Sequence, residues 1–524
     1  MFRLAISTIA CRTMMMEQVS MLMKKQFTTS WTKMHLYSTV SFSSNCSKIM
    51  EQNYENAIAT LNTLQSNNSV LQDSIQSRHK NDSKHTSDTV IFLKRIGITM
   101  EKLDLLPVIH VSGTKGKGTT CAMVESILRF NGYRTGFYSS PHLVSVTERI
   151  RLDGQPISKD RFAEHFWKIY NMLFAAQERD SDMPSYFGFL TLLALNVFIG
   201  SVDVAVIEVG IGGRYDCTNV IRNTQTVGIT SLGLEHTQLL GETLEAIAWQ
   251  KAGIVKQGSE VFVAEQPAEC IAVIENECRL KNAKLHIVPS RLEQYRWTKI
   301  PTMAHNRCPE MEINTSLAIQ IAVNWIRRTR PHILPFDDKL LIPENIVEGV
   351  NCYFWPGRLQ IIPCEGKRTI FLDGAHTPDS IAVCARWFKT KSANEHKRLL
   401  VFNSTGDRDA LSLLSTLART IAFDAAFFTP NLAFTASSTI FDTVNHNFPL
   451  ELQIQRCEKY HAHWINHLKQ TAGFVHNSVK SIFDYIDNNY PARDESCDIL
   501  ITGSIHLLGA TLIALRMEDR VLWR

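Results

Sequence analysis

PVIHVSGTKGKGTT, residues 107–120, is the stretch that decides the fold of this chain. Residues 108–111 are apolar and β-branched, which is typical of a buried strand, and apolar residues recur at helical spacing over positions 121–128. A glycine-lysine loop joins the two segments. Its glycines let consecutive backbone N–H groups surround an anion at a helix start, and Lys117 adds a charge for the outer phosphates. The stretch therefore predicts a binding loop for a nucleoside triphosphate.

This loop departs from the usual P-loop pattern. Only Thr114 and Lys115 separate Gly113 from Gly116, a shorter spacer than the general pattern has, and Gly118 stands where a Ser or Thr normally holds Mg²⁺. We therefore expect the metal ligand to come from Thr119 or from another loop.

Composition indicates a globular protein of several domains. The chain has 524 residues, of which 44% are apolar and 20% charged. Its formal charge of +4 is too small to argue for nucleic acid. The twelve cysteines form no CxxC pair, which favours reduced thiols, and no apolar run reaches the ~18 residues of a membrane span. We expect neither a nucleic-acid partner nor insertion into a membrane.

The first 49 residues differ from the rest. Six Lys and Arg residues face a single acid, Glu17, among many Ser, Thr and Met. This composition is typical of a mitochondrial transit peptide, although a disordered cytosolic extension would share it. Met50 precedes globular-looking sequence and could be a second start. The sequence thus predicts a mitochondrial matrix form and leaves room for inner-membrane association and for a cytoplasmic form.

Beyond a polar excursion over residues 66–88, strands and helices alternate in two series, which predicts an α/β fold with parallel sheets. We expect a P-loop-containing parallel-sheet ATPase domain over residues 50–350, followed by a smaller Rossmann-like α/β domain over residues 351–524. A helix is expected over residues 314–329. The expected strands are 108–111, 135–138, 202–209 and 226–231 in the first series, and 369–372, 399–402, 425–428 and 499–501 in the second.

Polar residues follow several of these strands, where ligands gather in open parallel sheets. Glu208 ends an apolar strand before a glycine turn, and burying a carboxylate there is costly without a cation. The alternative is a carboxylate that caps the next turn. Ser139 and Ser140, directly before Pro141, could supply the missing hydroxyl or could form a simple Ser-Pro turn.

Five further residues have more than one interpretation. His236 could be a metal ligand, a phosphate contact or structural, and Lys251 could be a surface lysine or a buried functional one. In the second series, Arg358 of WPGR suits a phosphate or carboxylate. Asp373 and His376, in LDGAHTPDS, could contribute to that site or cap the following helix.

Nine fragments in the same order resemble the folylpolyglutamate synthases, relatives of the Mur ligases, over roughly residues 50–509. They are HVSGTKGKGTT, GFYSSPHLVSVTERIRLDGQPIS, AVIEVGIGGRYDCTN, LEHTQLLG, IAWQKAGIVK, WPGR, LDGAHT, FNSTGDRD and ITGSIHL. The resemblance implies an ATP-dependent ligase that adds L-glutamate to the γ-carboxylate of tetrahydrofolate and its polyglutamates through an acyl phosphate. Such an enzyme would retain folates in the cell and mitochondrion for one-carbon metabolism, and we expect a monomer.

The resemblance also implies residue roles. Lys117, His376 and Lys251 would be catalytic, with Lys251 carried as a carbamate. Mg²⁺ would lie on Ser140, Glu208 and His236, and a monovalent cation such as K⁺ could also bind. His376 with Ser404 would lie where glutamate or the acyl phosphate binds. ATP would contact Gly113, Thr114, Lys115, Gly116, Lys117, Gly118, Thr119, Asn314, Arg358 and Asp373.

Two positions depart from the family pattern: Thr119 replaces the usual Ser, and Thr377 stands where bacterial members tend to carry Asn. Both substitutions keep a polar side chain. Tyr186, Phe187 and Phe189 could supply aromatic surface for the folate rings, or they could be core aromatics on a helix.

Other activities remain open on the sequence. The chain could be a dihydrofolate synthase, alone or as a bifunctional enzyme, because the same phosphoryl chemistry can accept dihydropteroate. A Mur-type ligase and a nucleotide-gated binding module without turnover are the more distant alternatives. The leader argues against the first of these, and the intact set of Glu208, His236, Arg358 and His376 against the second.

Overall fold

The computed structural model describes residues 51–65, 84–179, 182–302, 308–334, 338, 340–405, 408–435, 442, 450–470, 472–491 and 495–522. Residues from Gln52 to the C-terminus form one compact unit. The leader predicted over residues 1–49 and most of the polar excursion lie outside the described residues. In the part that is described, every cysteine is a free thiol, and no helix combines the length and apolar character that crossing a bilayer requires.

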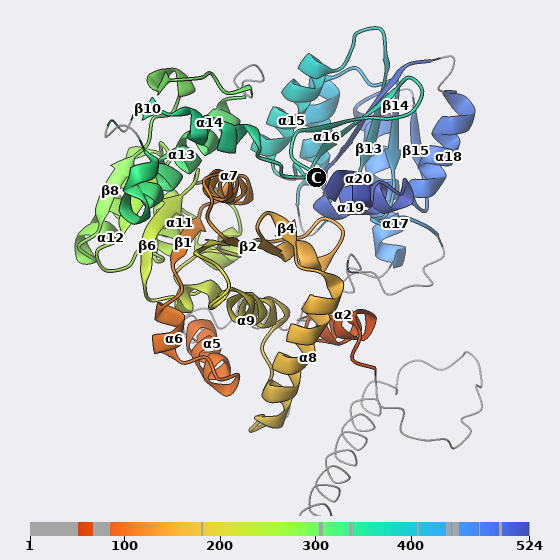
Figure 1. Ribbon diagram of the computed structural model, residues 1–524. Helices are drawn as coiled ribbons and strands as arrows, with labels where there is room; N and C mark the ends of the chain where they lie inside the picture. The colour runs from red at the N-terminus through yellow and green to blue at the C-terminus, as the bar shows by residue number, and fades with distance from the viewer. Residues whose placement is uncertain are drawn as a thin grey trace, which may run out of the picture. The chain divides into compact units, whose positions relative to one another are not determined.

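The first sheet carries the glycine-lysine loop (Figure 1). Its eight strands lie in the order β4-β3-β2-β5-β1-β6-β7-β8, and β2, β5, β1, β6, β7 and β8 pair in parallel. The bounds are β1 Val108–Ser112, β2 Thr135–Tyr138, β3 Ile150–Leu152, β4 Gln155–Pro156, β5 Val204–Glu208, β6 Thr224–Ile229, β7 Glu260–Val263 and β8 Lys284–Ile287.

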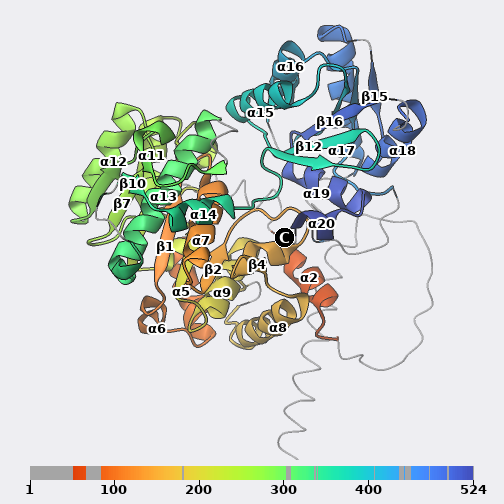
Figure 2. The ribbon, with the colours of Figure 1, turned by 45° about the horizontal axis from the view of Figure 1, so that its top comes forward.

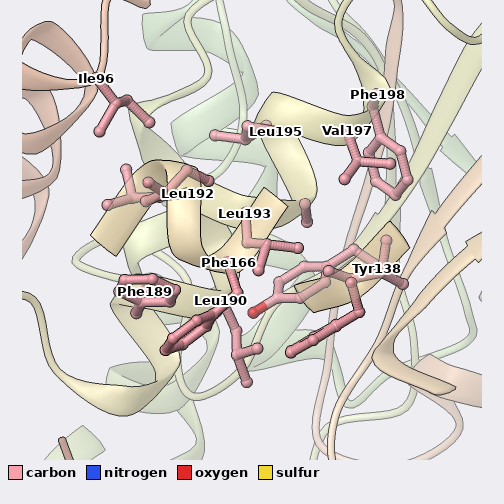
Figure 3. Close-up of a cluster of buried hydrophobic side chains, with 14 of the residues drawn as sticks. Ile96, Tyr138, Phe166, Phe189, Leu190, Leu192, Leu193, Leu195, Val197 and Phe198 are labelled. Atoms are coloured by element: carbon pink, nitrogen blue, oxygen red, sulfur yellow. The ribbon is translucent and has the colours of Figure 1, made fainter. Parts of the chain in front are cut away.

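Alternate side chains of β1 and β5 enter two cores, one on each face of this sheet. Val108 and Ile207 pack with α8 and α9, and Figure 3 shows α9 side chains gathered with Phe166 of α8 and Tyr138 of β2. Ile109 and Val206 pack on the other face with α7 and α13. The helices here are α2 Tyr54–Thr63, α5 Lys84–Arg95, α6 Met100–Asp104, α7 Lys117–Phe130, α8 Lys159–Ala175, α9 Tyr186–Phe198, α10 Thr237–Leu240, α11 Leu244–Ala252, α12 Ala268–Leu280, α13 Pro309–Thr329 and α14 Glu344–Asn351.

The second sheet has six strands in the order β11-β12-β16-β13-β14-β15. Helices α15 and α16 lie together on one side of it and α18 on the other (Figures 1 and 2). Strand β16, the last in the chain, pairs with both β12 and β13 in the middle of the sheet. The bounds are β11 Gln360–Pro363, β12 Arg368–Asp373, β13 Lys397–Phe402, β14 Ala425–Phe428, β15 Gly473–Val475, β16 Cys497–Thr502, α15 Pro378–Lys391, α16 Ala410–Thr420, α17 Leu450–Ala462, α18 Val479–Asn489, α19 Ile505–Ala514 and α20 Glu518–Leu522.

The predicted α/β fold with two sheets is confirmed, with the following differences. The sheets are not wholly parallel, because β3 and β4 at one end of the first sheet and β11 at one edge of the second pair in antiparallel fashion. Strands β3, β4, β7, β8, β11 and β15 were not predicted, and a separate two-stranded sheet joins β9 (Arg296–Trp297) to β10 (Leu341–Ile342). Helix α13 begins at Pro309 rather than at residue 314, because a proline and two acidic residues suit a first helical turn.

Candidate active site

The glycine-lysine loop runs from β1 into α7 as the sequence predicts. Gly116 is the N-cap of α7 with φ of 85°, and Ser231 O accepts from the backbone N–H groups of Thr114 and Lys115 at 3.0 and 3.1 Å. Glycine is required at two positions, because a Cβ at 113 would overlap Thr230 Oγ1 and one at 116 would overlap Asn314 Oδ1. Thr230 and Asn314 therefore pack against the loop backbone and require glycine at both positions.

The neighbours of Gly118 explain why the loop departs from the usual P-loop pattern at this position. A Cβ at this position would lie 3.3 Å from Trp355 Nε1 and 3.4 Å from Glu208 Oε2, so a Ser or Thr side chain would crowd the indole and require it to shift. Trp355 comes from the connection between α14 and β11. A serine is therefore disfavoured here by its neighbours.

The three predicted metal ligands border one cavity. Glu208 is buried, its Oε2 accepts from Ser140 N at 3.2 Å, and burial raises the pKa of its carboxyl although Lys117 opposes this shift. Carboxylate and hydroxyl oxygens suit Mg²⁺. Burial lowers the pKa of His236, which keeps its ring neutral, as metal binding requires. No three His, Cys, Asp or Glu side chains form a metal-binding group in the described ranges, so a cation here would need the Ser140 hydroxyl and water.

Lys251 is buried on α11 behind the loop, which excludes the surface alternative. Its Nζ donates to Gly113 O at 2.8 Å. Burial, and then the charge of Lys117, lowers the pKa of Lys251 to about 7, so a neutral amine is accessible near neutral pH.

Asp373 and His376 face the loop from the end of β12. Asp373 accepts from Leu359 N at 2.8 Å and from Ala375 N at 2.9 Å, and Arg358 approaches the backbone at Gly374. Neither residue caps α15, so the capping alternative is wrong for both. Thr377 is the cap, because the helix begins at Pro378.

Glu235 joins the two halves of the site and was not predicted. Its Oε2 lies 3.1 Å from Lys115 Nζ, and its Oε1 lies 3.5 Å from His376 Nε2. Although burial opposes the shift, the contacts with His376 and Lys115 hold the pKa of Glu235 far below its usual value. The only sequence signal was an acid adjacent to the candidate ligand His236.

Arg149 is a second unpredicted residue of the cavity wall. Its guanidinium lies 5.4 Å from the centre of the Tyr186 ring, and its Nε donates to His142 Nδ1 at 2.9 Å. Asp442, from the chain between β14 and α17, bonds to the segment that precedes Arg149. The Asp442 carboxylate accepts from Tyr54 OH at 2.6 Å and from the Val146 amide at 2.9 Å.

One cavity of about 1210 Å³ connects most of these groups, but Gly113 and Lys251 are not among its lining residues. Phe187 lines the cavity, so a contact between Phe187 and folate stays a prediction, whereas Phe189 is wholly buried in the core, as the second interpretation expects. Ser404 is buried beside the cavity, and Thr405 lines it instead. The predicted residues that border the cavity are Thr114, Lys115, Gly116, Lys117, Gly118, Thr119, Ser140, Glu208, His236, Asn314, Arg358, Asp373 and His376.

Known proteins resemble this chain over most of its length. The mitochondrial folylpolyglutamate synthase of Bos taurus is 41% identical, covering 79% of this chain and 74% of that protein, and the one from Homo sapiens is 41% identical, covering 80% and 74%. The Mycobacterium tuberculosis folylpolyglutamate synthase, whose structure was solved with ADP and AMPPCP, has a TM-score of 0.64 at 22% identity and covers 87% of this chain and 98% of that one. No family model matches the chain.

A phosphate loop on one α/β sheet that shares a cavity with a second α/β sheet, together with these relatives, defines an ATP-dependent ligase. More narrowly, the chain belongs to the folylpolyglutamate synthase family.

Proposed function

We propose that this chain adds L-glutamate to the γ-carboxylate of tetrahydrofolate and its polyglutamates, using ATP and an acyl phosphate intermediate. The observation that carries the proposal is the Glu235 bridge, which brings Lys115 of the phosphate loop and His376 of the second sheet to one carboxylate in one cavity. An enzyme that phosphorylates one substrate and then presents it to an amine needs the groups that bind the phosphates and the groups that act on the amine close together.

The first half-reaction transfers the γ-phosphoryl group of ATP to the folate carboxylate, because a carboxylate oxygen leaves poorly until it is phosphorylated. Loop amides, Lys117 and Arg358 would hold the phosphates, and Asn314 and Asp373 would complete the nucleotide site. In this site the Lys117 ammonium donates to Gly113 O at 3.1 Å, which keeps it beside the loop.

In the second half-reaction the amine of glutamate attacks the acyl phosphate, an amide bond forms, and phosphate leaves. His376 lines the cavity, and burial lowers its pKa although the hydrogen bond to Glu235 opposes this shift. A neutral imidazole can take a proton from the glutamate ammonium before attack.

The loop is bordered by a hydroxyl, a carboxylate and an imidazole, which are groups that can bind a divalent cation. Ser140, Glu208 and His236 would hold Mg²⁺, which when bound would neutralise charge on the phosphates. Lys251, with a pKa of about 7, has the neutral amine that carbamate formation needs, and the carbamate would add an anion behind the loop. A monovalent cation such as K⁺ stays a proposal that a salt titration of activity can test.

Folate would extend from the loop toward Met183, Phe187 and Tyr215, where the cavity gains apolar and aromatic surface. Such side chains suit the flat rings of a reduced folate.

Ligation can be tested directly. Purified protein is incubated with ATP, labelled glutamate and either tetrahydrofolate or dihydropteroate, and we expect label in the folate. Lys117→Ala should reduce ligation at least a hundredfold without changing the melting temperature, whereas Lys389→Ala on the exposed face of α15 should behave as wild type. Label only in the dihydropteroate arm would replace the proposal with dihydrofolate synthesis, and no label in either arm would refute it.

We also propose a mitochondrial matrix location, with a cytoplasmic form that starts at Met50. The support is the basic leader and the mitochondrial names of the relatives. Deleting residues 1–49 should leave activity intact and move a tagged protein to the cytosol; continued import would contradict the leader.

A monomer of two domains, residues 50–350 and 351–524, is our proposal for the assembly. The two large sheets share no strand within the described ranges, which supports this division. Sedimentation should give the mass of one chain, and limited proteolysis should cut in the connection that follows α14, beyond Asn351.

A further inference from the structure

Trp355 presents an unpartnered donor to the phosphate site. Its indole lines the cavity beside Gly118 and Glu208. No described residue accepts a hydrogen bond from Trp355 Nε1. An indole N–H can only donate, so its natural partner in this cavity is an anionic oxygen of a ligand.

The indole is held in place from several directions. Its ring centre lies 5.3 Å from that of Phe137 at an interplanar angle of 44°, and the Arg151 guanidinium lies 5.3 Å from the ring. Two residues earlier, Tyr353 packs against the core that α7 shares with α13. The segment that carries the indole is therefore held against α7 by packing on both sides of the ring.

In an ordinary P-loop, one hydroxyl at this position both donates hydrogen and offers its oxygen to Mg²⁺. Here Gly118 has no side chain, and the place where its Cβ would lie is flanked by Trp355 Nε1 at 3.3 Å and by Glu208 Oε2 at 3.4 Å. The first group is a donor and the second, when ionised, an acceptor.

We propose that Trp355 is a nucleotide-binding residue whose indole N–H donates to a phosphate oxygen, so that Trp355 and Glu208 divide between them the two functions of the missing hydroxyl. The proposal rests on the proposed function for its nucleotide, but it concerns binding and does not depend on which acceptor is glutamylated. The proposal also explains why residue 118 is glycine, because a serine side chain there would compete for space with the Trp355 indole.

The test begins with Trp355→Phe, which removes the N–H and keeps most of the ring. We expect the dissociation constant of a non-hydrolysable ATP analogue, measured by calorimetry with Mg²⁺ present, to rise about tenfold or more, as for a lost hydrogen bond to a charged group. Adenosine, which has no phosphate, should compete equally well with both proteins. Trp387→Phe, on α15 outside the cavity lining, is the matched control and should bind as wild type.

A second variant pair makes the test independent of ring packing. Trp355→Ala opens the space at 118, so adding Gly118→Ser to it should restore analogue affinity by several-fold, whereas Gly118→Ser alone should weaken binding. Unchanged analogue affinity in Trp355→Phe, or an equal loss for adenosine, would overturn the proposal. Wild-type protein that fails to glutamylate tetrahydrofolate would instead refute the proposed function, and the binding comparison would still decide the role of Trp355.

Discussion

Gly116→Ala should separate the backbone cost of the phosphate loop from the cost of crowding its neighbour. Gly116 has φ of 85°, and placing an L-residue there costs about 1–2 kcal/mol. The new Cβ would also overlap Asn314 Oδ1 and lie 2.7 Å from Asn314 Cγ, so this side chain must move away from the loop. We expect the melting temperature to fall by roughly 2–8 °C and the affinity for an ATP analogue to fall at least tenfold.

Gly97→Ala is the matched control. Gly97 has φ of 76°, and its added Cβ would meet nothing within 4 Å, so this variant has the backbone cost alone. Thermal unfolding and calorimetry are measured on both variants. If Gly116→Ala matched Gly97→Ala in melting temperature and in nucleotide affinity, the geometric reasoning about the loop would be refuted.

Three further substitutions examine the connections around the cavity. Glu235→Gln removes the charge between Lys115 and His376 and should lower kcat/KM for glutamate at least tenfold, measured by labelled ligation. Lys251→Met should remove a pH dependence of the melting temperature. The pKa of Lys251 is about 7 in the folded protein and 10.5 in the unfolded chain, so between these values the unfolded chain binds the extra proton. The melting temperature of the wild type should therefore rise relative to that of the variant from ~pH 7.5 to ~9.5. Asp442→Ala should lower the melting temperature by a few degrees, since two buried donors lose their carboxylate.

Each of the three substitutions has its own control and its own result that would contradict the reasoning. Glu245→Gln, exposed on α11, should match wild type, and equal activity of the two glutamine variants would contradict the bridge. Parallel pH curves for wild type and Lys251→Met would contradict the lowered pKa. Asp442→Asn should recover part of the lost stability because an amide oxygen still accepts, and a melting temperature below that of the alanine variant would contradict the hydrogen-bond explanation.

The sequence predicted the strands that end at the site because they are short, apolar and followed by polar turns. It missed β7 and β8, since EVFV and KLHI mix charged with apolar residues and β8 lies at the exposed edge. The predicted site residues mostly meet in one cavity because the carboxyl ends of parallel strands share an edge.

Other contacts of the site join residues that lie far apart in the chain, and no local sequence pattern encodes such contacts. Glu235 binds His376, and Asp442 binds Tyr54 across 388 positions. Trp355 stood out in the sequence only as part of WPGR. Its proposed function depends on Gly118, which lies far earlier in the chain. Capping of α15 by Asp373 or His376 stayed an open alternative on the sequence, because only the position of the helix start identifies Thr377 as the cap.

The position of β16 constrains how the protein can be made. Because Cys497–Thr502 pairs on both sides, with β12 and with β13, the ribosome delivers the middle of that sheet last. A nascent chain must therefore leave the facing edges of β12 and β13 unpaired until β16 is made, while β1 to β8 can already have assembled. A premature stop codon shortly before position 497 would remove β16 and so split the sheet that bears Asp373, with His376 just beyond it.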